Sequence, residues 1–107
     1  MNEKIKEIRF NPEKAQCFFS KKLAFTLGPI ELKNLLDEGK VKLLDVRKKE
    51  DYDIAHIPSA ISIPKDELAE NVDKLSKEEV TVVYSYNQQC QLSAKACLIL
   101  ADYGYPT

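Results

Sequence analysis

Three short apolar segments, separated by long polar stretches, constrain the fold of this chain most strongly. They are Val41–Val46 (VKLLDV), Ala60–Ile63 and Val80–Tyr84 (VTVVY), and their content is typical of strands in a buried sheet. The stretches between them hold 13 and 16 residues, which is enough for crossovers between parallel strands. The spacing therefore predicts an α/β fold, a small and mostly parallel sheet with helices on both faces, joined by right-handed crossovers.

Helical patterns occupy the stretches between these segments. One helix is predicted to begin at Pro29 and to stop at Gly39, because proline suits a first turn and glycine suits a C-terminal cap. The other predicted helices are Lys49–Ile54, Asp66–Leu75 with a break near Asn71, and Ser93–Tyr103. Strands and helices thus alternate through residues 26–107, as expected of one domain.

Residues 1–25 are predicted to be an extension that precedes this domain. Asn11 is a residue type that caps helices, and Pro12 and Glu13 suit a first turn, so a helix should begin there. The segment Lys22–Thr26 is then predicted to form a short edge strand.

Composition narrows the classes of function. The formal net charge is −1, from 16 basic and 17 acidic residues, which removes any bulk electrostatic case for binding nucleic acid or an anionic membrane. The longest apolar run is Ala96–Ala101, and the first ten residues lack the apolar core of a secretory signal. Three irregularly spaced cysteines favour neither a disulfide framework nor a metal site. We therefore expect a cytoplasmic protein with no metal and no cofactor.

The segment after Val80–Tyr84 is the strongest candidate for chemistry. Its residues run from a predicted buried strand into a predicted helix: Ser85, Tyr86, Asn87, Gln88, Gln89 and Cys90. Backbone N–H groups at a helix start are unpaired, and the helix dipole is positive there, so such a turn binds anions and stabilises a thiolate. Cys90 is therefore a candidate nucleophile, although burial as a small apolar residue is an alternative for it. Cys17 and Cys97 are predicted to be packing residues.

Three polar residues elsewhere are predicted to support the loops. Asp45 interrupts an apolar strand, and a buried carboxylate needs a partner, which Arg47 can supply from two residues further on. His56 is the only histidine, and it has no further ligands for a metal, so we expect it to orient a loop by hydrogen bonding.

The stretch Leu44–Pro64 (LDVRKKEDYDIAHIPSAISIP) resembles the signature of rhodanese-like sulfurtransferase domains. In that family an Asp-x-Arg strand end precedes an acidic–Tyr pair and a Gly-His-Ile-Pro-Gly-Ala turn, with Ala55 and Ser59 here at the glycine positions. The matching residues are Asp45, Arg47, Asp51, Tyr52, His56, Ile57, Pro58 and Ala60. Gln91–Pro106 resembles the helix that follows the family's active loop, so the resemblance covers about residues 26–107.

The resemblance implies a persulfide chemistry that Ser85 does not support. In the family, the residue directly after the valine-rich strand is a cysteine, which takes sulfane sulfur from thiosulfate or a protein persulfide and passes it on. This chain has Ser85 at that position. The resemblance therefore implies impaired sulfur transfer, with Cys90 as the candidate carrier and the backbone of Tyr86, Asn87, Gln88, Gln89 and Cys90 as the anion cradle. Ser85 is then an introduced substitution, the mark of a naturally inactive relative, or a sign that Cys90 has taken over.

Other classes of function remain beside this one. A non-catalytic binding or regulatory module would keep the fold and use the loop to recognise a partner, and a redox-sensing thiol at Cys90 would need a lowered pKa. A related phosphatase would need both a cysteine at the strand exit and a loop arginine, and the loop has neither.

The end of the sequence also departs from the family. Rhodanese-like domains continue past the Gly-Tyr-Pro segment into a further strand and turn, whereas this sequence stops at Thr107. Either the sequence is a fragment, or residues 1–25 replace the missing cover, or a partner chain supplies it. An uncovered strand edge favours association, so we expect a tendency to form homodimers through that edge.

Overall fold

The computed structural model describes residue 3, residues 11–87 and residues 91–107. Gln88, Gln89 and Cys90 therefore lie outside the described residues, and the predictions made for them stay predictions. Internal contacts divide the chain into two units, Met1–Asn34 and Leu35–Thr107, which are described separately.

The first unit contains the helix α2, Pro12–Phe25. The Asn11 side chain caps it by accepting a hydrogen bond from the Lys14 backbone N–H at 3.1 Å, as the sequence predicts. The predicted edge strand at Lys22–Thr26 is wrong, because the helix continues to Phe25. Once nucleated, a helix adds one hydrogen bond for each further residue, and no breaker interrupts this segment. Cys17 is exposed on α2, so its predicted packing role is also wrong.

Helix α3, Pro29–Asp37, crosses the boundary between the two units and ends as predicted. Gly39 has a φ of +68°, the left-handed conformation that glycine adopts without strain. The Lys40 N–H closes this helix end with a bond to the Leu35 carbonyl at 3.1 Å.

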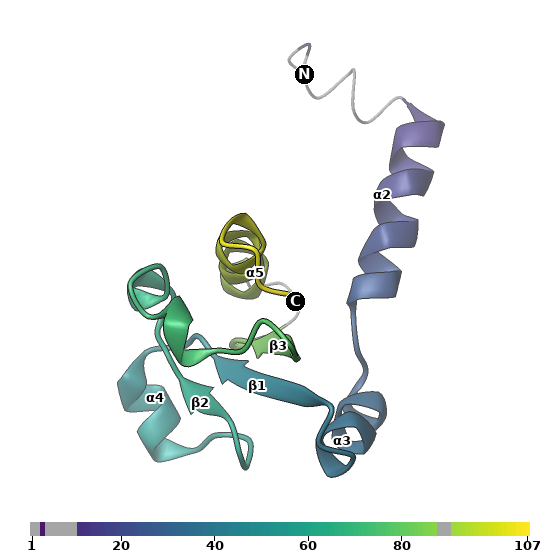
Figure 1. Ribbon diagram of the computed structural model, residues 1–107. Coiled ribbons are helices and arrows are strands. Elements are labelled where there is room, and N and C mark those ends of the chain that lie inside the picture. Colours follow the sequence, from purple (N-terminus) through teal and green to yellow (C-terminus); the bar gives the residue numbers. More distant parts are fainter. Residues whose placement is uncertain (1–2, 4–10, 88–90) are drawn as a thin grey trace. The chain divides into compact units, whose positions relative to one another are not determined.

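The second unit is built on a parallel sheet of three strands in the order β2-β1-β3 (Figure 1). The strands are β1 (Val41–Asp45), β2 (Ile61–Ser62) and β3 (Val80–Tyr84). The register pairs Leu44 with Ile61 and Asp45 with Tyr84. The predicted parallel α/β fold is confirmed, and the carboxyl ends of β1 and β3 meet at one edge of the sheet.

The connections between the strands follow the predictions in part. Helix α4 spans Lys49–Ile54, as predicted, and helix α5 spans Leu92–Asp102, shifted by one residue at each end. The predicted helix over Asp66–Leu75 is instead two short 3-10 turns, η1 (Lys65–Glu67) and η2 (Val72–Lys74). The break does fall at Asn71, whose side-chain amide donates to the Glu67 carbonyl at 2.7 Å and so ends the first turn.

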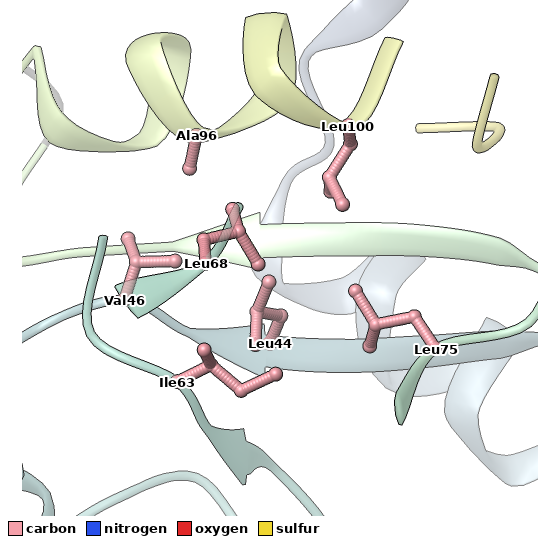
Figure 2. Close-up of a cluster of buried hydrophobic side chains, with 7 residues drawn as sticks. All are labelled: Leu44, Val46, Ile63, Leu68, Leu75, Ala96 and Leu100. Atoms are coloured by element: carbon pink, nitrogen blue, oxygen red, sulfur yellow. The ribbon is translucent and has the colours of Figure 1, made fainter. Parts of the chain in front are cut away.

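The core lies between β1 and α5. Figure 2 shows Ala96 and Leu100 pointing from α5 towards the other buried side chains. The cluster consists of Leu44, Val46, Ile63, Leu68, Leu75, Ala96 and Leu100. Because side chains alternate along a strand, Leu43 and Asp45 point to the opposite face of the sheet from Leu44. Asp45 is nevertheless fully buried, so its carboxylate needs partners on that face.

The last residues lie along the outer edge of β3. The Pro106 carbonyl accepts from the Thr81 N–H at 3.0 Å, and the Thr107 hydroxyl donates to the Thr81 carbonyl at 2.9 Å. The same hydroxyl lies 3.3 Å from the sulfur of Cys97, which is partly buried on α5. Both backbone groups of Thr81 are thus bonded already, and the predicted homodimer through this edge stays a prediction.

Candidate functional site

A pocket of about 440 Å³, open to solvent, lies at the carboxyl ends of β1 and β3. Ligands of open parallel sheets bind at this end of the strands. The pocket is lined by Arg47, Ala55, His56, Ile57, Pro58, Tyr84 and Ser85. The structure thus brings together three residues that the sequence singles out, namely Arg47, His56 and Ser85.

Ser85 follows β3 directly and is partly buried. Its hydroxyl oxygen lies 2.7 Å from the hydroxyl oxygen of Ser93, in the first turn of α5. In the part of the chain that the structure describes, neither His56 nor a carboxylate hydrogen-bonds to Ser85. Among these described residues the hydroxyl therefore has a polar partner but no hydrogen-bonded base to remove its proton.

Arg47 pairs with the buried Asp45 beneath the pocket. The guanidinium Nη2 lies 2.8 Å from Asp45 Oδ2, and Nε lies 3.1 Å from both carboxylate oxygens. The backbone N–H of Arg47 also donates to Asp45 Oδ1 at 2.9 Å. Burial alone would raise the pKa of Asp45, but the hydrogen bonds and charge of Arg47 outweigh it and hold the pKa below its ordinary value.

The same guanidinium reaches the turn that follows α4. Arg47 Nη2 donates to the Ala55 carbonyl at 2.7 Å. The guanidinium carbon also lies 5.7 Å from the centre of the Tyr84 ring and 5.8 Å from that of the Tyr86 ring. These are cation–π distances, so Arg47 ties the end of β1 to the pocket turn and to both tyrosines.

The two tyrosines on either side of Ser85 are anchored by long-range hydrogen bonds. The Tyr84 hydroxyl accepts from the Ile57 N–H at 3.1 Å, and burial raises its pKa. The Tyr86 hydroxyl donates to the Asp51 carboxylate, which raises the pKa of Tyr86, and accepts from the Lys48 N–H at 3.4 Å. Tyr84 is not among the site residues predicted from the sequence. A parallel pairing of its strand with the Asp45 strand would have placed it beside Asp45.

His56 orients the turn from its exposed position. Its Nδ1 lies 2.8 Å from the Tyr52 carbonyl oxygen, and its ring stacks on the Tyr52 ring with 3.6 Å between the centres. Because a carbonyl oxygen only accepts, Nδ1 is the donor in this hydrogen bond. The Tyr52 hydroxyl in turn donates to the Ala60 carbonyl at 2.7 Å, which closes the turn onto β2.

Ser59 adopts a left-handed backbone conformation in this turn, with a φ of +72°. Replacing Ser59 with glycine is expected to raise the free energy of unfolding by about 1 kcal/mol, because a residue with a Cβ is strained at this φ and glycine is not. Urea denaturation measures the change. Ala55→Gly is the control: Ala55 is extended, with a φ of −164°, so glycine there should destabilise by about 0.5–1 kcal/mol. A loss of stability in Ser59→Gly would contradict the argument.

The remaining predicted loop residues are described only in part. Tyr86 lines a second, smaller pocket of about 220 Å³, whose other lining residues include Lys48, Lys65 and Leu92. Asn87 is exposed, and Gln88, Gln89 and Cys90 lie outside the described residues, so the amide cradle stays a prediction. Ser93 is absent from the candidate residues named from the sequence, because it lies eight positions from Ser85 and no local pattern indicates their contact.

The described residues also bear on metal binding and on membrane spanning. They contain no group of three or more histidine, cysteine, aspartate or glutamate side chains placed to hold a metal ion. No helix among them has both the length and the apolar character needed to cross a membrane.

Sequence comparison finds relatives of two kinds. The chain is 38% identical over 74 residues to the HTH-type transcriptional regulator Rv0324 of Mycobacterium tuberculosis, covering 69% of this chain and 33% of the regulator. It is 40% identical over 62 residues to the probable adenylyltransferase/sulfurtransferase MoeZ of the same species, covering 55% of this chain and 16% of MoeZ. The chain thus spans a third or less of these longer proteins.

Solved structures and a family model agree with this fold. A rhodanese-like domain protein from Staphylococcus aureus is 34% identical, with a TM-score of 0.64 over 71% of this chain and 74% of its own. The BH2092 protein from Bacillus halodurans is 32% identical, with a TM-score of 0.75 over 90% of this chain and 72% of its own. The model of the rhodanese-like domain matches residues 28–107. The chain that carries the Ser85 pocket at the end of a parallel sheet therefore belongs to the rhodanese-like domain family.

Proposed function

We propose that the pocket beside residue 85 is a sulfur-transfer site, and that Ser85 leaves this chain unable to store sulfane sulfur there. The observation that carries the proposal is the position of Ser85. It stands directly at the carboxyl end of β3, lines the pocket and bonds to the first turn of α5. A cysteine at this position would present its sulfur to the same pocket.

The chemistry explains why oxygen cannot replace sulfur here. A cysteine thiolate attacks the outer sulfur of thiosulfate, a new S–S bond forms, and the old S–S bond breaks with its electron pair leaving on sulfite. The resulting persulfide gives its outer sulfur to a nucleophile such as cyanide or a protein thiolate, and the cysteine thiolate returns. The Ser85 hydroxyl stays protonated at neutral pH and has no hydrogen-bonded base, so the first attack does not occur.

Cys90 is the candidate for any sulfur carriage that remains in this chain. It lies five residues after Ser85 and shortly before Leu92, where α5 begins. A thiol close to a helix start has a lowered pKa and is more reactive at neutral pH. Under this proposal the donor is a small sulfur-containing anion such as thiosulfate, or a protein persulfide.

Asp45, Arg47 and His56 are proposed to support the site rather than to react. Arg47 donates from Nε and Nη2 to Asp45 and Ala55, and His56 Nδ1 is bonded to the Tyr52 carbonyl. These contacts hold the end of β1 and the 55–60 turn in place, and that turn forms much of the pocket wall.

Sulfur loading tests the proposal directly. The chain, its Cys90→Ala variant and its Ser85→Cys variant are incubated with thiosulfate and analysed by mass spectrometry with peptide mapping. We expect Ser85→Cys to gain one sulfur atom at residue 85, and the unchanged chain to gain none there. A sulfur at residue 90 that disappears in Cys90→Ala would identify Cys90 as the carrier. A folded Ser85→Cys protein without sulfur at residue 85 would refute the site.

A binding or regulatory module is the second candidate, because the pocket is formed although its serine is not activated. The hydrogen bond to Ser93 satisfies the Ser85 hydroxyl, and one relative is a transcriptional regulator. In this case thiosulfate should shift the backbone NMR signals of the pocket residues in the unchanged chain, without sulfur loading and equally in Cys90→Ala. Binding that requires Cys90 would argue against the module.

A further inference from the structure

We propose that Ser93 is a positioning residue that holds the side-chain oxygen of Ser85 at the pocket and would stabilise a thiolate at position 85, a role that rests on the proposed function. Its hydroxyl oxygen lies 2.7 Å from the Ser85 hydroxyl oxygen, and both residues are partly buried. Eight positions separate the two residues in the sequence, so their contact joins the end of β3 to the first turn of α5.

The helix that carries Ser93 is firmly seated. Ala96 and Leu100 follow Ser93 by three and seven positions, so all three residues lie on one face of α5. Ala96 and Leu100 are fully buried in the core cluster shown in Figure 2. Ser93 therefore lies on the buried face of α5, at the helix end next to β3. The packing of α5 on the core sets the position of the Ser93 hydroxyl.

The direction of the hydrogen bond depends on what residue 85 carries. Between two hydroxyl groups, either oxygen can be the donor. A thiolate at residue 85 has no proton, so Ser93 would have to donate to it. A hydrogen bond to the charged form of a thiol favours that form and lowers the pKa of the thiol. Ser93 would thus raise the fraction of reactive thiolate and keep the sulfur directed at the pocket.

The thiol pKa of residue 85 is the readout that separates this role from a structural one. We expect Ser85→Cys to show a pKa about one unit lower than Ser85→Cys with Ser93→Ala, a tenfold difference in the equilibrium between thiol and thiolate. The pH dependence of iodoacetamide alkylation, mapped to residue 85 by mass spectrometry, gives both values. Ser93→Thr in the same background should retain the low pKa, because it retains the hydroxyl.

Ser62→Ala is the matched control in the Ser85→Cys background. The Ser62 hydroxyl is buried and has no hydrogen-bond partner among the residues that the structure describes, so its removal should leave the thiol pKa unchanged. If Ser93→Ala fails to fold, the isosteric pair Ser93→Thr and Ser93→Val still isolates the hydroxyl. Equal thiol pKa values with and without the Ser93 hydroxyl would overturn the proposal.

The outcome for Ser93 is distinguishable from that for the proposed function. If Ser85→Cys loads sulfur but its thiol pKa is the same with and without the Ser93 hydroxyl, the role of Ser93 is refuted and the sulfur-transfer site is still supported. A Ser85→Cys protein that shows the pKa difference but never loads sulfur supports the hydrogen bond and refutes sulfur transfer.

Discussion

Replacing Ser85 with cysteine is expected to raise thiosulfate:cyanide sulfurtransfer by at least roughly a hundredfold over the unchanged chain, since restoring a missing nucleophile has the largest effect of any single side chain in a site. The pocket lined by residue 85 is already formed, and the Ser93 hydroxyl already lies beside that residue. Sulfur and oxygen differ in this reaction because only a thiolate is both populated near neutral pH and able to form a persulfide. Steady-state formation of thiocyanate measures the rate.

Two controls make the result specific to residue 85. Adding Cys90→Ala to Ser85→Cys should leave most of the gained activity, because the new cysteine is then the carrier. Ser62→Cys introduces a thiol at the end of β2 instead of β3, and no gain is expected from it. A gain as large in Ser62→Cys as in Ser85→Cys would show that any added thiol suffices, against the proposed site.

Replacing Asp45 with alanine is expected to lower the free energy of unfolding by about 3 kcal/mol, the low end of the range for breaking a buried ion pair. Asp45 is fully buried, and Arg47 keeps 16% of its side-chain surface exposed. Without Asp45, the unpaired guanidinium charge would therefore be only partly solvated by water. Chemical denaturation gives the value. Asp53→Ala is the matched control: Asp53 pairs with Lys49 at 3.1 Å on the exposed face of α4, and its loss should cost about 0.5 kcal/mol or less. Equal effects for the two variants would contradict the burial argument.

The depressed pKa of Asp45 adds a pH dependence with a defined sign. A carboxyl group whose pKa is lower in the folded state stabilises the fold above its unfolded pKa, and this contribution is lost as pH falls through the folded pKa. The stability difference between the unchanged chain and Asp45→Asn should therefore be largest near neutral pH and shrink below about pH 4. A difference that grows on acidification would show that the pKa of Asp45 is raised instead.

Predictions from the sequence succeeded where the signal was local. The valine-rich segment Val80–Tyr84 and the interval after Val46 predicted parallel strands, and Asn11 predicted the start of α2. They failed where the structure of a segment depends on the residues around it. Residues 22–25 resemble a strand in isolation but extend an established helix, which is favoured by one more hydrogen bond per residue.

The 66–75 segment shows how a side-chain hydrogen bond to the backbone overrides a local helical pattern. Leu68 and Leu75 are both buried in the core cluster, and Asn71 lies between them with its side chain bonded to the Glu67 carbonyl. Because the two leucines are seven positions apart, one continuous helix would also place both on its buried face. The break comes from Asn71, whose side-chain amide takes the Glu67 carbonyl while its backbone N–H bonds to the Leu68 carbonyl, and a periodicity argument does not register this local competition.

The sequence by itself determined the α/β class, the parallel order of connections and the polar residues that follow each strand, since these depend on spacing and residue type. Only the tertiary structure decided which polar groups meet. Tyr86 bonds to Asp51 across 35 positions, Tyr84 bonds to Ile57 across 27, and Ser85 meets Ser93 across a loop. Such contacts leave no local pattern, because the strand register and the seating of α5 on the core bring their partners together.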